Sequence, residues 1–180
     1  MLTFAPLMKK GESFGKEFLI PFGGEKLGKH PHDFEIGKAF FDSGISEVEV
    51  LNAAINLLFI LEKQSAMLTL HFNFDGTITV PCDRCNAPVE IPIQSSEKLY
   101  VKFSQGGFDT TDEVITIADS ESHIDLGPYV YEFIWLALPM KFVHDEGECD
   151  QDVIDQLEHY NPDDEDDNID PRWDALKNLK

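Results

Sequence analysis

Residues 67–80 read MLTLHFNFDGTITV, and apolar side chains stand at every second position through most of this run. They are Leu68, Leu70, Phe72, Phe74, Ile78 and Val80. A period of two places alternate side chains on the same face of an extended chain, so the run predicts a β-strand with one buried face. Asp75-Gly76 interrupts the alternation and predicts a break in the strand.

Similar runs lie on both sides of this stretch. Upstream, residues 48–61 alternate over most of their length, although Ala53-Ala54 also permits a helix, and the polar residues 62–65 fit a turn. Downstream come a break at Pro81–Pro88 and a polar interruption at Gln94–Glu97. Further strands are predicted at Val89–Ile93, Leu99–Phe103 and Val114–Ile117. Because no helix between these strands is long enough for a parallel crossover, we expect an antiparallel sheet.

One helix follows the strands. Tyr129–Leu138 is almost wholly apolar, Pro128 stands near its first turn, and Pro139 ends it. A helix of this composition must be buried against the sheet. The sequence therefore predicts an α+β fold: an antiparallel meander-like sheet or a partly open β-barrel with one buried helix.

The first 46 residues carry weaker signals. Glu17–Pro21 predicts a short strand, and Ile36–Phe41 fits either a turn of helix or an irregular segment. We therefore expect residues 1–46 to be an irregular part of one domain. Its α+β core spans residues 47–149, and an acidic tail that ends in a short helix spans residues 150–180.

The charge of the chain restricts its partners. Acidic residues outnumber basic ones by 34 to 14, the net charge is -20, and thirteen of the acids lie in residues 145–170, which contain no Lys or Arg. Such a chain gains nothing from the release of phosphate counterions, so a surface that coats nucleic acid is disfavoured and basic proteins are favoured as partners. The acidic run is either a solvated, solubilising segment or an interaction arm.

The tail divides into three predicted parts: a short helix over Asp150–Tyr160, a linker over residues 161–168 without apolar side chains, and a second helix that begins at Asp170-Pro171. A helix of about ten residues is marginal alone in water, so the last one either folds back on its own domain or docks on a partner. The candidate partner-binding residues are Asp163, Asp164, Glu165, Asp166, Asp167, Arg172, Trp173, Leu176 and Leu179.

The start of the chain, MLTFAPLMKKGES, places its lysines after a short apolar run, where a secretion signal would place them before it. The longest apolar stretch, Leu51–Leu61, is too short to cross a bilayer and contains two Asn residues. We therefore expect a cytoplasmic protein. The three cysteines then indicate reduced thiols or a metal rather than a disulfide framework.

Four residues could form a metal site. Cys82-Asp-Arg-Cys85 lies between two predicted strands, while His144 and Cys149 follow the predicted helix. Together they would supply the Cys3His set that suits structural zinc. Unligated thiols and redox chemistry stay open. However, Pro88 and the strand after it replace the helix N-terminus that lowers the thiol pKa in a thioredoxin-like site.

No pattern in the sequence indicates catalysis. The chain has no phosphate-binding glycine loop, no nucleophile elbow and no H-E-x-x-H motif. We therefore expect that it is not an enzyme, and no small-molecule substrate is evident.

Several pieces of the sequence, in this order from about residue 45 to the C-terminus, resemble the YceD family of large ribosomal RNA subunit accumulation proteins. These pieces are Cys82-Asp-Arg-Cys85-Asn, Ile124-Asp-Leu126, Glu132 through Leu136-Ala-Leu-Pro139, His144 with Cys149, and Asp170-Pro-Arg-Trp-Asp-Ala-Leu-Lys-Asn-Leu. The resemblance implies a non-enzymatic bacterial protein that supports normal levels of 23S rRNA and acts in large-subunit synthesis or assembly.

The charge then suggests how such a protein would act. We expect protein contacts with a basic partner, such as a large-subunit ribosomal protein, and disfavour direct rRNA binding because residues 1–144 are themselves acidic. The alternative is a zinc-dependent regulatory or thiol redox protein that uses Cys82 and Cys85.

Overall fold

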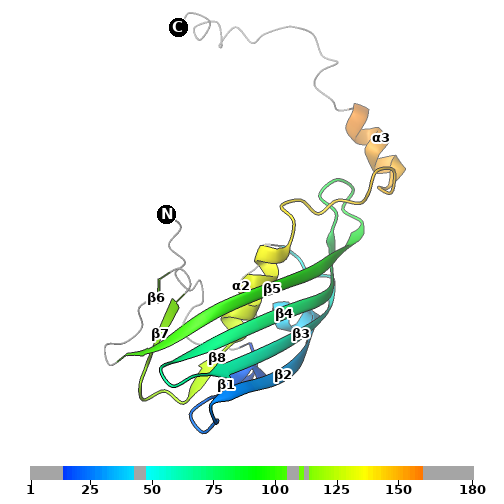
Figure 1. Cartoon of the computed structure of the whole chain (residues 1–180). Coiled ribbons are helices and arrows are strands. Elements are labelled where there is room, and N and C mark those ends of the chain that lie inside the picture. Colours follow the sequence, from blue (N-terminus) through cyan, green and yellow to red (C-terminus); the bar gives the residue numbers. More distant parts are fainter. Residues whose placement is uncertain (1–13, 43–47, 105–109, 112–113, 160–180) are drawn as a thin grey trace, which may run out of the picture.

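The computed structural model describes residues 14–42, 48–104, 110–111 and 114–159 (Figure 1). Within them, six strands form one open sheet in the order β2-β3-β4-β5-β7-β6, and β1 pairs with β8 in a two-stranded sheet. The strands are β1 (Leu19–Pro21), β2 (Gly28–Gly37), β3 (Asn52–Lys63), β4 (Met67–Pro81), β5 (Pro88–Ser104), β6 (Thr110–Thr111), β7 (Val114–Ala118) and β8 (His123–Asp125).

The described helices are the short 3-10 helix η1 (Lys16–Phe18) and the α-helices α1 (Lys38–Asp42), α2 (Gly127–Ala137) and α3 (Gln151–His159). Figure 1 shows α2 lying behind the large sheet. The chain therefore has the α+β class that the sequence predicts, with a sheet-rich core. None of the helices among these residues is long and apolar enough to cross a membrane.

The central strand β4 is continuous, so the predicted break at Asp75-Gly76 is wrong. It pairs antiparallel with β3 on one side and with β5 on the other. Gly76 has a φ of 157°, and a Cβ there would run into the carbonyl oxygen of Ala54 on β3. Glycine therefore lets the two strands approach closely without ending either one.

The strand β5 is also longer than predicted, because Gln94–Glu97 does not interrupt it. These polar residues stay in register with β4, where Gln94 lies opposite Asp75 and Ser96 lies opposite Asn73. Gln94 and Ser96 are exposed, whereas Ser95 and Glu97 are half-buried. On the covered face, Ser95 donates a hydrogen bond to Glu97 at 2.7 Å, and on the solvent face polar residues are usual, so the polar run does not end the strand.

Two details of the sheet differ from the prediction. First, β7 pairs parallel with the last five residues of β5, from Tyr100↔Val114 to Ser104↔Ala118. Because the overlap is short, the chain returns only roughly 13 Å, which the nine intervening residues can span without a crossover helix. Second, β2 and β6 are opposite edges of the sheet, so the alternative of a partly open barrel is wrong.

The N-terminal region is more regular than predicted. Gly28–Gly37 forms the ten-residue strand β2, which the sequence did not predict, and it pairs with β3 along its whole length. Its inward-facing positions are His30, His32, Phe34 and Ile36, so only two of them are apolar and the alternation is weak. Of the predicted strand Glu17–Pro21, the last three residues form β1, and α1 begins two residues after Ile36.

The covered face of the sheet carries the core. Phe59 and Phe72 are fully buried, and the Phe72 ring lies 5.1 Å from that of Phe133 on α2. Only one face of α2 is fully buried, at Gly127, Val130 and Ile134, and Leu136 on this helix is 62% exposed. The helix is therefore buried against the sheet on that face, as predicted, while its other residues are half-buried or exposed.

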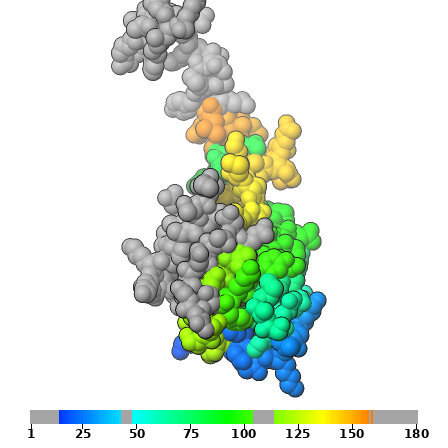
Figure 2. Space-filling view, turned by 60° about the vertical axis from the view of Figure 1, so that its left-hand side comes forward, coloured from blue at the N-terminus to red at the C-terminus, as the bar shows by residue number. Residues whose placement is uncertain are grey.

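The chain after α2 leaves the sheet. Figure 2 shows the yellow segment that follows α2, and the orange α3, projecting beyond the end of the body. The predicted helix Asp150–Tyr160 is confirmed as α3. The rest of the acidic tail, including the predicted terminal helix, lies outside the described residues.

Candidate metal centre

The tip of the β4–β5 hairpin presents the first pair of thiols. Pro81 and Pro88 form the last pair of the ladder between β4 and β5, so the loop 82–87 lies beyond the end of the sheet. The Cys82 amide donates to the Ala87 carbonyl at 2.8 Å, and the Asn86 amide donates back to the Cys82 carbonyl at 2.9 Å. Asn86 has a φ of 60°, a left-handed conformation that Asn tolerates well. This tight turn places Cys82 and Cys85 on one loop.

The second pair comes from the segment between α2 and α3. Asp83, between the two loop cysteines, holds this segment in place through two hydrogen bonds. Its amide donates to the Phe142 carbonyl at 2.7 Å, and its Oδ2 accepts from the Phe142 amide at 2.7 Å. The chain then turns through Gly147, which has a φ of 87°, and brings His144 and Cys149 to the hairpin loop.

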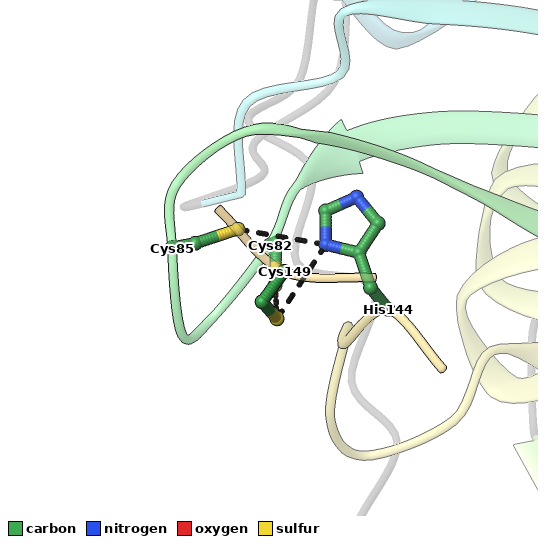
Figure 3. A group of neighbouring side chains, drawn as sticks. All are labelled: Cys82, Cys85, His144 and Cys149. Carbon is green, nitrogen blue, oxygen red and sulfur yellow. Dashed lines mark hydrogen bonds between the residues drawn. The ribbon is translucent and has the colours of Figure 1, made fainter. Parts of the chain in front are cut away.

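The four side chains predicted as metal ligands meet at one point (Figure 3). Their donor atoms all lie within 4.8 Å of one another. The His144 Nδ1 is 3.5 Å from the Cys85 Sγ and 3.8 Å from the Cys149 Sγ, and the Cys82 and Cys149 Sγ atoms are 4.0 Å apart. In a tetrahedral zinc site, bond lengths of about 2.0–2.3 Å place neighbouring donors roughly 3.5–3.8 Å apart. The observed spacing is compatible with a metal ion among them.

The imidazole of His144 is held in a defined orientation. Its Nε2 donates a hydrogen bond to the Pro88 carbonyl at 3.0 Å, so Nδ1 is the nitrogen that faces the sulfurs. Metal-bound histidines usually donate their second N–H to such an acceptor, which fixes the tautomer that leaves the other nitrogen free to bind. The Pro88 carbonyl therefore prepares His144 as an Nδ1 ligand.

The electrostatics of the cluster favour a cation. Burial opposes the thiolate of Cys82, but hydrogen bonds from the Cys85 and Arg84 amides outweigh it and lower the pKa of Cys82 to about 6. The hydrogen bond to Pro88 and contact with Cys82 raise the pKa of His144. A thiolate is thus available at neutral pH, and a metal would displace the remaining protons.

The three cysteines are buried, with exposures of 3% for Cys82, 8% for Cys85 and 9% for Cys149, and none is in a disulfide. A set of four protein donors leaves no open position for a substrate, which is typical of structural zinc sites. The hairpin loop leads into β5, as the sequence predicts, so Cys82 and Cys85 lack the helix N-terminus of a thioredoxin-like site.

The sequence predicts all four residues that meet in the cluster but not the residues that position them. Asp83 and Pro88 stand in or next to the C-x-x-C motif, yet their partners lie 59 and 56 residues away. Nothing in the sequence shows that these segments meet. The predicted partner-binding residues, from Asp163 to Leu179, lie outside the described residues.

A family model described as "Large ribosomal RNA subunit accumulation protein YceD" matches residues 70–180. The match includes β5, α2 and all four candidate metal ligands, and it begins later than the resemblance noted above, within β4. No curated protein and no solved structure is detectably similar to the chain.

Proposed function

The chain belongs to the YceD family, and from this membership we propose that it supports the accumulation of 23S rRNA during biogenesis of the large ribosomal subunit. It acts through protein contacts, without catalysing a reaction. Its partner is a basic protein, such as a large-subunit ribosomal protein. The family match over residues 70–180 is the observation that carries this proposal.

Charge supports a basic protein over RNA as the direct partner. At a net charge of -20, the chain repels phosphates and attracts cationic surfaces. This attraction would speed the binding of a cationic protein to the chain at low ionic strength. A ribosomal protein that has not yet met rRNA carries an uncompensated positive charge. An acidic factor could hold such a protein until rRNA, with its higher charge density, displaces it.

The test compares rRNA levels and protein capture. Deleting the gene should lower the amount of 23S rRNA relative to 16S rRNA, and the full chain should restore it. The immobilised chain should also retain basic proteins extracted from purified large subunits, and retention should weaken with salt. Unchanged 23S rRNA in the deletion strain would refute the proposed role, whereas retention of rRNA alone would refute the protein-contact mechanism.

We further propose that Cys82, Cys85, His144 and Cys149 bind one structural zinc ion. The donor spacing, the burial of the thiols and the orientation of His144 support this assignment. Purified chain should contain about one zinc per molecule by elemental analysis, and His144→Ala should lower that content sharply. A chain that takes up no zinc when refolded with equimolar metal would contradict the assignment.

One observation favours a second candidate, thiol redox regulation. Cys82 has a pKa of about 6, and its Sγ lies 4.0 Å from that of Cys149. A low-pKa thiol beside a second cysteine is one feature of redox sensors, although Cys82 is only 3% exposed and lacks the accessibility such sensors usually have. Rapid, reversible disulfide formation in the metal-loaded chain under mild peroxide, with a matching change in 23S rRNA, would favour this role over a purely structural centre.

A further inference from the structure

The two faces of the large sheet are unequally covered. One face packs against α2 and the aromatic core, whereas the other face of β2, β3, β4 and β5 points away from α2 (Figure 1). On this open face, neighbouring strands place their residues in rows. Asp33, Leu58, Asn73 and Ser96 form one row, and Glu35, Asn56, Asp75 and Gln94 form the next.

Charge is segregated along the open face. Lys29, Lys98 and Lys102 lie toward the end where β4 begins, and the one acid among them, Glu62, lies opposite Lys29 and is paired with His71. Asp33, Glu35 and Asp75 lie further along, and Glu90 follows them. The face therefore has one basic end and one acidic end, although the chain as a whole is acidic.

The acidic end is also hollowed and partly apolar. A shallow cavity of about 900 Å³ is lined by residues of both rows. Leu58 lies there, 41% exposed, between Asp33 and Asn73 in the ladder. An exposed leucine among carboxylates and amides gives the surface a central apolar contact with polar groups around it, which is how protein interfaces are commonly arranged.

The carboxylates at this end are free to bind a cation. Among the described residues, the ion pairs join His30 to Glu25, Lys38 to Asp42 and His71 to Glu62, so none of them uses Asp33, Glu35 or Asp75. Glu35 and Asp75 stand two strands apart, a separation of roughly 10 Å. In a segment with polyproline II geometry, two basic side chains three positions apart share one face and have about the same spacing.

We propose that this acidic sheet end, formed by Asp33, Glu35, Asn56, Leu58, Asp75 and Gln94, binds an extended basic segment of the protein partner. Lysine or arginine side chains of the segment contact the carboxylates, the amides of Asn56 and Gln94 hydrogen-bond to it, and an apolar side chain covers Leu58. RNA is a poor occupant because its phosphates would face three unpaired carboxylates. The inference rests on the proposed function and adds to it the surface that recognises the partner.

The test uses the full chain, immobilised, with basic proteins extracted by high salt from purified large ribosomal subunits as the probe. The first variant, Asp33→Asn with Glu35→Gln and Asp75→Asn, removes three negative charges from the surface. A matched variant, Glu17→Gln with Asp119→Asn and Glu121→Gln, removes three exposed charges elsewhere. Leu58→Ala changes the surface without changing charge.

We expect the first variant to lower retention of at least one ribosomal protein about tenfold and the matched variant to lower it less than twofold. Leu58→Ala should lower retention of the same protein about threefold. Equal losses from the two triple variants would overturn the proposal, because they would indicate attraction by net charge alone. Full retention by Leu58→Ala, or an rRNA fragment that competes for the same surface, would also overturn it.

The result separates this inference from the function beneath it. If the unmodified chain retains no ribosomal protein, the proposed protein-contact mechanism fails and the surface fails with it. If the unmodified chain and the first variant retain the same protein equally, the mechanism stands and only the surface is wrong. Circular dichroism of each variant verifies that the sheet is intact.

Discussion

The sheet and the thiol cluster hold the chain together in different ways. The sheet is built from long, continuous ladders with an apolar face, such as the fifteen paired positions from Met67↔Lys102 to Pro81↔Pro88. The segment between α2 and α3 instead meets the hairpin loop through a few hydrogen bonds and four donor atoms. The sheet thus depends on many replaceable contacts, whereas the cluster depends on a few specific ones.

The largest effect should come from removing a donor at the cluster. His144→Ala should lose part of a zinc-binding free energy that reaches about 10–16 kcal/mol in Cys/His sites, because a water would have to replace one of the four protein donors. Competition with a chromogenic chelator measures the affinity. His159→Ala, on exposed α3, is the matched control and should bind as the unmodified chain does. Hydrogen exchange should show the sheet still protected, and a loss of that protection would mean that the two regions are not independent.

The next effect concerns the sheet alone. Phe72→Ala should lower the free energy of unfolding by about 3–5 kcal/mol, because Phe72 is fully buried against Phe59, Phe74 and Phe133. Denaturant titration measures it. Leu136→Ala, on the exposed side of α2, should change stability by less than about 0.5 kcal/mol. The zinc affinity of the folded Phe72→Ala chain should equal that of the unmodified chain. A large drop would show that the cluster depends on the packing of the sheet.

A smaller effect should come from the residue that aligns the two halves of the cluster. Asp83→Ala removes the carboxylate that accepts from the Phe142 amide, so His144 and Cys149 should be less well placed. Zinc affinity should fall about tenfold, a change of about 1.4 kcal/mol. Arg84→Ala alters the neighbouring exposed side chain and should leave the affinity unchanged. Equal affinities for the two variants would show that Asp83 does not position the ligands.

The last effect should appear as pH dependence of the metal-free chain. Because folding lowers the pKa of Cys82 from 9.0 to about 6, the share of stability from its thiolate is complete above pH 9 and is lost as the pH falls through 6. Absorbance at 240 nm should show a thiolate step near pH 6 that Cys82→Ser removes and Cys149→Ser retains. A first step near pH 9 would mean that the loop amides do not stabilise the thiolate.

The contrast also explains what the sequence could and could not predict. The strands β3 and β4 could be predicted from local alternation, because buried apolar side chains stand at every second residue through most of each strand. Strand β2 was not predicted, because the polar residues His30 and His32 occupy two of its inward-facing positions and weaken the alternation. The parallel pairing of β7 with β5 was not predicted, because the pairing of strands depends on tertiary contacts that leave no local pattern in the sequence.

At the cluster, chemistry was easier to predict than geometry. The chain has only three cysteines, and the spacing of His144 from Cys149 distinguishes it from the other five histidines. The meeting of the cysteines with His144 depends on contacts such as Asp83 with Phe142, which leave no local pattern. The acidic sheet end escaped for the same reason, because its residues come from four strands and share a surface only after the ladders have formed.

Gly76 carries a consequence for how this protein can evolve. Any side chain at that position would collide with the Ala54 carbonyl and would also have to adopt a backbone conformation that only glycine enters readily. A saturation library selected for folded protein should therefore keep one codon family at position 76 while neighbouring exposed sites drift. Position 76 in β4 is thus intolerant of substitution, because the backbone of β3 lies too close to it.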